Sequence, residues 1–416
     1  MNDTQASQEL IGRPFRLPCG QEIKNRLMKS AMSEALGTAD NHVTTGLVTL
    51  YDRWARGGVG LLVTGNIMID RKALGEPNNV AVEDERDIDL LRAWARAGTQ
   101  MDTRLWVQLN HPGKQVPKGL NTEAVAPSAI PFNKALRRFF DTPRELTEDE
   151  IQDLVERFGR SAEIVKKAGF TGVQIHAAHG YLVSQFLSPH HNRREDHWGG
   201  SPEDRRRFLV EVFRRIRAGV GPDFPVAVKL NSADFQRGGF TEEESLAVIQ
   251  ALAEDGVDLV EISGGNYEAP AMSGRKVAES TLLREAYFLA FAGKVRDRID
   301  VPLAVTGGFR TASAMREALA EGHLDMIGMA RPLAVDPDYA HKILTGRPPT
   351  VTIRPISTGI KAVDHMALME VAWYSRQLHR MANGKDPRPD ESGLSSFIKT
   401  VLTSGYRTFK TRRLRA

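Results

Sequence analysis

The chain is poor in cysteine, lacks long apolar runs and carries little net charge. Cys19 is the one cysteine among 416 residues. This excludes a disulfide scaffold, cysteine-ligated iron–sulfur clusters and cysteine-rich zinc sites, all of which need several thiols. No apolar stretch is long enough to span a bilayer, and Met1 to Leu10 lack the charged-then-apolar pattern of a secretory signal. We therefore expect a cytoplasmic protein without membrane insertion.

Charge of one sign is also scarce. The 56 basic and 52 acidic side chains leave a net charge of +4, and the two signs are mixed along most of the sequence. Only residues 407–415 are mainly basic, and a short basic terminus is usually a solvated tail. We therefore expect no nucleic-acid partner, because such binding relies on clustered positive charge.

The sequence does contain a repeated unit, a short apolar strand followed by a longer helical pattern. One helical pattern covers Glu148–Ala168, where Thr147 and Glu150 form a capping box at the start and Gly169 ends the helix. Strands that alternate with helices pair in parallel, and eight such units close into a (β/α)8 TIM barrel, an α/β fold. The predicted strands are Leu27–Met32, Val59–Thr64, Arg104–Asn110, Gly172–His176, Val226–Asn231, Asp258–Ser263, Pro302–Thr306 and Met326–Ala330.

Two regions lie outside this repeat. Pro14–Asn25 is predicted to form a hairpin that turns at Cys19 and Gly20 and plugs the amino-terminal end of the barrel. We expect residues 1–348 to form the barrel domain and residues 349–416 a helical extension that packs on the barrel or on a partner subunit of a homo-oligomer. Its second helical pattern carries an apolar stripe of Leu394, Phe397, Ile398, Val401 and Leu402.

In such a barrel the active site lies at the carboxyl ends of the strands. The seventh and eighth strands end in Gly307-Gly308 and Ala330-Arg331. Glycines let backbone N–H groups approach an anion closely, so we expect a phosphate there. Lys229, near the end of the fifth strand, is costly to bury alone. We expect it to face an anion or to pair with a neighbouring carboxylate.

The fourth strand runs into His176, His179 and Tyr181. Two imidazoles three residues apart on a helical turn can present N–H donors to one point, and the tyrosine adds an O–H group. The trio can thus hold a developing oxyanion and deliver a proton. A buried histidine pair without chemistry is another reading. Metal binding is the third, because histidines and carboxylates follow closely, namely His190, His191, Glu195, Asp196 and His197.

The strongest pattern is the segment Gly172-Val173-Gln174-Ile175-His176-Ala177-Ala178-His179-Gly180-Tyr181-Leu182 with its continuation to Phe208. Related stretches cover 25–33, 108–113, 306–310 and 330–337, hence most of residues 10–345. These residues resemble the Old Yellow Enzyme family of FMN-dependent NAD(P)H:flavin oxidoreductases and ene-reductases. The resemblance implies bound FMN, NAD(P)H as co-substrate, and hydride transfer to the activated C=C bond of a small enone-type molecule. No Gly-x-Gly-x-x-Gly motif follows a strand, so we expect no separate dinucleotide-binding domain. NAD(P)H must therefore bind at the barrel mouth.

The resemblance also implies roles for single residues. His176 and His179 fall where the family binds a substrate oxygen, and Tyr181 falls at its usual proton donor. Gln108 resembles the residue on the flavin pyrimidine edge, and Lys229 a basic residue beside flavin N1 and O2. The flavin-lining positions are Ser30, Ala31, Met32, Ser33 and Asn66, and the phosphate cradle is Gly307, Gly308, Ala330 and Arg331. The resemblance implies no metal ligand.

Some positions depart from the family pattern. Ser33 stands where the family often has Thr or Cys, which excludes a cysteine at the flavin. Lys229 replaces the commoner Arg and offers fewer fixed donors, and Ala330 replaces a usual Gly. Trp198 stands where Tyr is usual.

Other functions remain open from the sequence, among them a non-catalytic flavin-binding or interaction protein that holds FMN without turnover. The same flavin platform also serves amine dehydrogenases and NADH oxidases. A metal-dependent barrel hydrolase built on the cluster from His176 to His197 is the alternative from another class. We expect the loops Asn121 to Arg144 and Asn266 to Glu279 to set substrate specificity.

Overall fold

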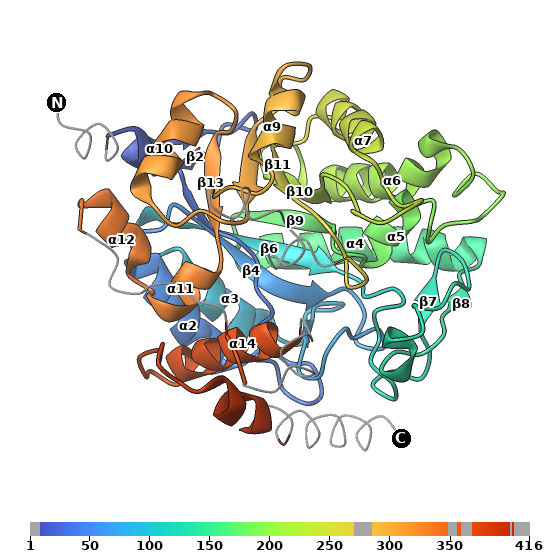
Figure 1. Ribbon diagram of the computed structural model, residues 1–416, viewed down its shortest axis with the longest axis horizontal. Helices are drawn as coiled ribbons and strands as arrows, with labels where there is room; N and C mark the ends of the chain where they lie inside the picture. The colour runs from blue at the N-terminus through green and yellow to red at the C-terminus, as the bar shows by residue number, and fades with distance from the viewer. Residues whose placement is uncertain (1–8, 270–284, 348–355, 359–367, 400–401, 403–416) are drawn as a thin grey trace.

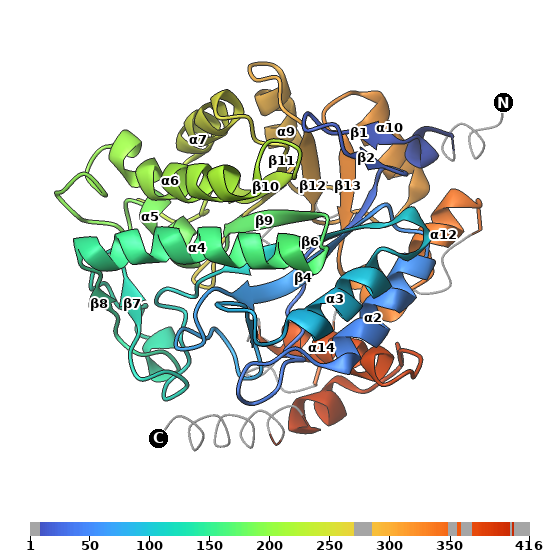
Figure 2. The ribbon, with the colours of Figure 1, turned by 180° about the vertical axis from the view of Figure 1, so that it is seen from behind.

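Eight parallel strands close into a barrel with helices on the outside (Figures 1 and 2). The computed structural model describes residues 9–269, 285–347, 356–358, 368–399 and 402. The strand order is β3-β13-β12-β11-β10-β9-β6-β4, and a further pairing of β3 with β4 closes the ring, so the predicted (β/α)8 barrel is confirmed. The barrel strands are β3 (Leu27–Lys29), β4 (Leu61–Met68), β6 (Arg104–Asn110), β9 (Gly172–Ala177), β10 (Val226–Asn231), β11 (Leu259–Ser263), β12 (Leu303–Thr306) and β13 (Met326–Met329).

Local end signals define the outer helices. In α4 the Thr147 hydroxyl accepts from the Glu150 N–H, the Glu150 side chain accepts from the Thr147 N–H, and Gly169 ends the helix at a φ of 95°, as predicted. In the part of the chain that the structure describes, the helices around the barrel are α2 (Thr45–Arg56), α3 (Ile88–Gly98), α4 (Glu148–Ala168), α5 (Leu182–Leu187), α6 (Pro202–Val220), α7 (Glu242–Glu254), α9 (Leu289–Arg296), α10 (Ala312–Ala320), α11 (Arg331–Val335) and α12 (Tyr339–Leu344).

The predicted hairpin closes the amino-terminal end of the barrel. Strands β1 (Phe15–Arg16) and β2 (Glu22–Ile23) pair antiparallel around Gly20, whose φ of 89° suits glycine. Leu17 and Ile23 join the apolar cluster inside the barrel. The hairpin plug is therefore confirmed.

The inside of the barrel changes from apolar to polar along the strands. Side chains alternate between the inside and the helix layer, so every second residue of a strand points inward. The lower layer is apolar and includes Met28, Trp106, Ala227, Leu259 and Ala304. Two residues further along the same strands, the inward positions are polar, namely Ser30, Gln108, Lys229, Glu261 and Thr306. This polar layer lies directly below the barrel mouth.

Strand β4 is longer than predicted because it contains an irregularity. Its pairing with β6 shifts register between Val63 and Asn66, and the strand continues to Met68. A Cβ on Gly65 would lie 2.4 Å from the Met32 carbonyl oxygen, so this close approach requires glycine. Asn66 consequently lies within β4 rather than after it.

Helix α14 (Leu368–Ala382), in the carboxyl-terminal region, packs on α2 and α11 (Figure 1). Ser375 Oγ donates to the Ser33 carbonyl at 2.8 Å, and His379 Nε2 donates to the Glu34 carbonyl at 2.7 Å. The predicted domain boundary at residue 349 lies outside the described residues and stays a prediction.

Part of the predicted apolar stripe lies on the surface. Leu394, Ile398 and Leu402 are 37%, 51% and 70% exposed, whereas Val401 lies outside the described residues. A partner subunit for this stripe remains a prediction. No helix in the described part of the chain is long and apolar enough to cross a bilayer.

Candidate active site at the barrel mouth

His176, His179 and Tyr181 meet where β9 ends. The His176 ring lies 5.2 Å from the His179 ring and 4.7 Å from the Tyr181 ring, measured between centroids. The predicted helical turn is wrong, because His176 is part of β9 and His179 has a left-handed φ of 60°. The sharp turn that continues through Gly180 brings the rings together, and Tyr181 then forms the N-cap of α5.

Both histidines are neutral at ordinary pH. Burial, the neighbouring His179 and Lys229 hold the pKa of His176 well below its usual 6.5. Burial and Lys229 do the same to the pKa of His179. Since His176 Nδ1 accepts from the Ala178 N–H at 3.3 Å, its proton is on Nε2, which can donate. His179 Nε2 and Ser263 Oγ lie 2.8 Å apart.

Tyr181 is 8% exposed and has two polar partners. Asn66 Nδ2 donates to its oxygen at 3.3 Å, and the hydroxyl of Tyr267 lies at 3.2 Å. Burial, together with Tyr267 and Glu76, raises the pKa of Tyr181 well above 10, so the phenol carries its proton. Tyr267 belongs to the loop after β11 and was not predicted as a site residue, although the loop from Asn266 to Glu279 was predicted to set substrate specificity.

Lys229 has a carboxylate partner inside the barrel. Its ammonium lies 2.9 Å from Glu261, and the two side chains are 4% and 0% exposed. Gln174 donates to the same carboxylate at 2.7 Å, and Gln108 donates to Gln174 at 2.7 Å. Burial opposes ionisation of Glu261, but Lys229 and the donated hydrogen bonds outweigh it and lower the pKa of Glu261. The ion-pair alternative for Lys229 is therefore the observed one.

The network continues toward β3. Thr306 Oγ1 donates to Glu261 at 2.6 Å, so Ser30, 2.6 Å from Thr306 Oγ1, is the donor in the next hydrogen bond. A Cβ on Gly328 would lie 1.8 Å from Thr306 Oγ1, so glycine is required there. Ser30 is fully buried and thus lies below the mouth rather than on its surface.

A second buried cluster, which the sequence did not reveal, lies between β3 and α2. Lys29 Nζ donates to the Val63 carbonyl at 2.7 Å and to Tyr51 at 3.1 Å, and it lies 3.5 Å from Glu34. Burial lowers the pKa of Lys29 to about 8 although Glu34 acts in the opposite direction. Glu34 also accepts from the Gly65 N–H at 3.1 Å. The cluster therefore fixes β4 beside the residues predicted to line the flavin.

The residues at the mouth suit a flavin. Ala31, Met32, Ser33 and Asn66 are partly exposed, in contrast to the buried strand interiors, and so are Gly307, Gly308, Ala330 and Arg331. The Ser33 hydroxyl donates a hydrogen bond to the Glu76 carboxylate. Below them lie the side-chain amides of Gln108 and Gln174 and the Lys229 ammonium. These are N–H donors of the kind that the oxygen acceptors on the pyrimidine edge of a flavin require.

Backbone N–H groups just after β12 already bind an anionic side chain. Glu285 accepts from the N–H groups of Arg310 and Thr311 at 2.7 and 3.2 Å, just after Gly307 and Gly308. Both glycines have a positive φ, 135° and 97°. Backbone donors at this edge can therefore bind an anion, as a flavin phosphate requires.

The metal alternative receives only partial support. His190, His191 and Glu268 have ligand atoms within 4.8 Å of one another. However, the Lys114 ammonium lies 3.0 Å from His191 Nδ1 and 3.9 Å from Glu268, so a cation already lies in this cluster. His197 belongs elsewhere, 3.3 Å from Glu148 at the surface.

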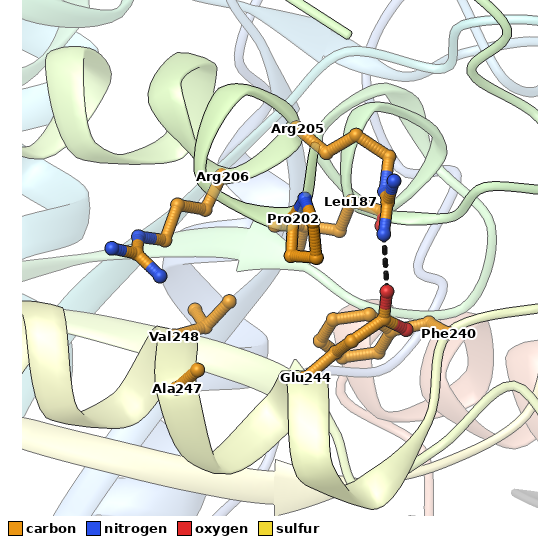
Figure 3. Close-up of a pocket in the computed structure, with 8 residues that line it drawn as sticks. All are labelled: Leu187, Pro202, Arg205, Arg206, Phe240, Glu244, Ala247 and Val248. Atoms are coloured by element: carbon orange, nitrogen blue, oxygen red, sulfur yellow. Dashed lines mark hydrogen bonds and ion pairs between the residues drawn. The ribbon is translucent and has the colours of Figure 1, made fainter. Parts of the chain in front are cut away.

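A hollow in the helix layer lies between α6 and α7, away from these residues (Figure 3). Arg205 and Glu244 form an ion pair across it. Figure 3 shows this pair beside Pro202 and Phe240, without any residue of the barrel mouth. We therefore assign this hollow to helix packing.

Known proteins with similar sequences bear on this site. The model of the NADH:flavin oxidoreductase / NADH oxidase family matches residues 12–350. An NADH-dependent flavin oxidoreductase of Hypocrea jecorina (strain QM6a) is 37% identical over 389 residues, which cover 88% of this chain and 94% of that protein.

Solved structures agree with the sequence match. A 2-naphthoyl-CoA reductase in complex with 2-naphthoyl-CoA is 25% identical with a TM-score of 0.75, over 89% of this chain and 58% of that longer chain. The old yellow enzyme homologue from Zymomonas mobilis has the same fold, with a TM-score of 0.69 at 24% identity over 82% of this chain and 94% of that one. The chain thus belongs to the NADH:flavin oxidoreductase / NADH oxidase family, the Old Yellow Enzyme family, and is an FMN-dependent NAD(P)H:flavin oxidoreductase.

Proposed function

We propose that the protein reduces the activated C=C bond of a small enone-type substrate. The observation that carries this proposal is the convergence of His176, His179 and Tyr181 at the barrel mouth, with ring centroids 5.2 and 4.7 Å apart. Bound FMN supplies the hydride chemistry, which links NAD(P)H oxidation to reduction of the substrate. The likeness to a protein named as a 2-naphthoyl-CoA reductase supports a reductive role.

The two histidines polarise the substrate. His176 Nε2–H and one N–H of His179 donate to the carbonyl oxygen, which makes the β-carbon electrophilic. In this arrangement the Ser263 hydroxyl donates to His179 Nε2. The single ring proton of His179 then lies on Nδ1, from which it donates to the substrate oxygen. Neutral imidazoles suit the task, since each keeps one donor without adding a charge to the buried site.

Tyr181 is the general acid in this proposal. Its raised pKa keeps the phenol protonated until negative charge develops on the substrate, and Asn66 donates to its oxygen. Gln108 and Lys229 would bind the pyrimidine end of FMN, with Ala31, Met32, Ser33 and Asn66 beside the ring. Ser30 is fully buried and would support them from below through Thr306. Gly307, Gly308, Ala330 and Arg331 bind the phosphate.

The test is an anaerobic absorption experiment on the purified holoenzyme. NADPH or NADH should bleach the flavin band, and 2-cyclohexenone should restore it. Tyr181→Phe should slow the second step about 10²- to 10⁴-fold and leave the first unchanged. Equal losses in both steps would remove Tyr181 from the proton-donor role.

An NADH oxidase on the same platform would behave differently. Its flavin band would bleach with NADH and return with oxygen but not with 2-cyclohexenone. An amine dehydrogenase would be reduced by an amine instead of NADH. In both cases Tyr181→Phe should have no effect on reoxidation, because no carbon is protonated there.

A further inference from the structure

Tyr267 contacts the proposed proton donor directly. Its hydroxyl lies 3.2 Å from that of Tyr181, and their ring centroids are 6.2 Å apart. Tyr267 is partly exposed, whereas Tyr181 is only 8% exposed. Tyr267 therefore contacts the buried hydroxyl of Tyr181 at the distance of a hydrogen bond and is itself in part accessible to solvent.

The loop that carries Tyr267 is held in place on two sides. Asn266 forms a β-bridge with His179, so the loop is tied to the turn of the histidine pair. On the other side Glu268 accepts from the Asn133 N–H at 2.9 Å and lies 3.9 Å from the buried Lys114 ammonium. The Phe140 ring packs on Tyr267 with 6.1 Å between centroids. The position of Tyr267 is thus specified by the surrounding structure.

Both hydroxyls hold their protons in the resting enzyme. Burial raises the pKa of Tyr267 to about 12, and the hydrogen bond with Tyr181 acts in the opposite direction. Burial raises the pKa of Tyr181 well above 10, and the contact with Tyr267 raises it further. The two hydroxyls therefore titrate as a coupled pair, and burial keeps both protonated in the resting enzyme.

We infer that Tyr267 returns a proton to Tyr181 in each turnover, so that the two tyrosines form a relay from solvent to the substrate carbon. This relay rests on the proposed ene reduction. When the Tyr181 O–H bond breaks, its proton forms the new C–H bond at the α-carbon. In the same step the Tyr267 proton moves to the Tyr181 oxygen, and Tyr267 then takes a proton from water. One solvent proton is consumed for each alkene, and no electrons move in this step.

The test is the rate of flavin reoxidation by 2-cyclohexenone in mixtures of H2O and D2O. Because two protons are transferred in the same step, the reoxidation rate of the wild type should depend non-linearly on the deuterium fraction of the solvent. Tyr267→Phe should slow reoxidation by about tenfold, the effect of losing one hydrogen-bonded donor, and make the dependence linear. Tyr267→Phe/Tyr181→Phe should be no slower than Tyr181→Phe, because the relay acts only through Tyr181.

Controls separate this role from a structural one. Flavin reduction by NADH should be unchanged in Tyr267→Phe. Tyr339→Phe removes a buried hydroxyl that donates to the Arg310 carbonyl at 2.6 Å, and it should keep the curved dependence. A Tyr267→Phe enzyme with the wild-type rate and curvature would overturn the relay, even if the wild type reduces the enone as proposed.

A second readout needs neither FMN nor substrate. 3-Fluorotyrosine ionises at lower pH than tyrosine, so fluorine NMR of the labelled protein can follow each hydroxyl. The charged or titratable groups that face the pair are Glu76 and His176. We expect the two signals to titrate as a coupled pair, and Tyr181→Phe to raise the pKa of Tyr267 because the hydrogen bond between the hydroxyls is lost. A pKa of Tyr267 that is unchanged in Tyr181→Phe would overturn the relay independently of enone reduction.

Discussion

Removing the ammonium of Lys229 should destabilise the barrel. Its partner Glu261 is fully buried, 2.9 Å away, and would be left as a charge without a counter-ion. Breaking a buried ion pair from one side costs about 3–5 kcal/mol. Gln174 and Thr306 still donate to the carboxylate at 2.7 and 2.6 Å, so the lower end of that range applies. We expect Lys229→Met to lower the free energy of unfolding by about 3 kcal/mol at pH 8.

The loss should depend on pH in a defined direction. In the wild type the folded pKa of Glu261 is lowered, so the stability it contributes is present above its unfolded pKa and is lost as pH falls through the folded value. In Lys229→Met the burial effect dominates, and the folded pKa lies above the unfolded value of about 4.3. The charge on Glu261 then destabilises the folded variant only above about pH 4.3, where the unfolded chain is ionised. The difference between variant and wild type should therefore be smaller at pH 5 than at pH 8.

Urea unfolding of the apoprotein, followed by tryptophan fluorescence at pH 5 and pH 8, measures this difference. The double variant Lys229→Met/Glu261→Gln removes both charges and should recover most of the loss, because replacing a buried pair together is often nearly neutral. A loss below about 1 kcal/mol at pH 8 would refute the reasoning. So would a loss that is independent of pH, or a double variant no more stable than Lys229→Met.

Two further predictions concern the frame of the site. Gly328→Ala would place a methyl group 1.8 Å from Thr306 Oγ1 and should cost about 1–3 kcal/mol in thermal unfolding. Gly12→Ala, with its nearest contact at 3.7 Å, is the matched control and should cost less than Gly328→Ala. His379→Ala removes the donor to the Glu34 carbonyl at 2.7 Å and should cost about 1 kcal/mol. FMN should also dissociate faster from this variant, measured by the rise of flavin fluorescence after dilution, and an unchanged rate would show that α14 does not support the flavin site.

The sequence predicted the elements whose signals are local. All eight barrel strands are present, and α4 has the predicted bounds, because alternation, capping residues and a terminal glycine act within a few residues of each other. His176, His179 and Tyr181 were likewise found together because they follow one another in the chain. Their geometry was not predicted, since a left-handed turn rather than a helix brings the rings into contact.

The polar network needed strand register, which the sequence does not contain. Lys229 is aligned with Glu261 on β11, and Gln108 is aligned with Gln174 on β9. A shift of one residue would turn each of these side chains to the helix layer. The charge of Lys229 could therefore be recognised from the sequence, but its partner could not be chosen from the many carboxylates in the chain.

The partner of Tyr181 depends on loops, which are the least predictable part of the site. Tyr267 is 86 residues away in sequence, and its loop is held by contacts with Asn133 and Lys114 from a different loop region. Loops tolerate changes that strands do not, because fewer buried contacts depend on them. In our proposals the strand that presents His176 positions the substrate oxygen, whereas the loop after β11 supplies Tyr181 with protons. It follows that the two functions can vary separately within this fold, and that only the first is visible in the sequence around β9.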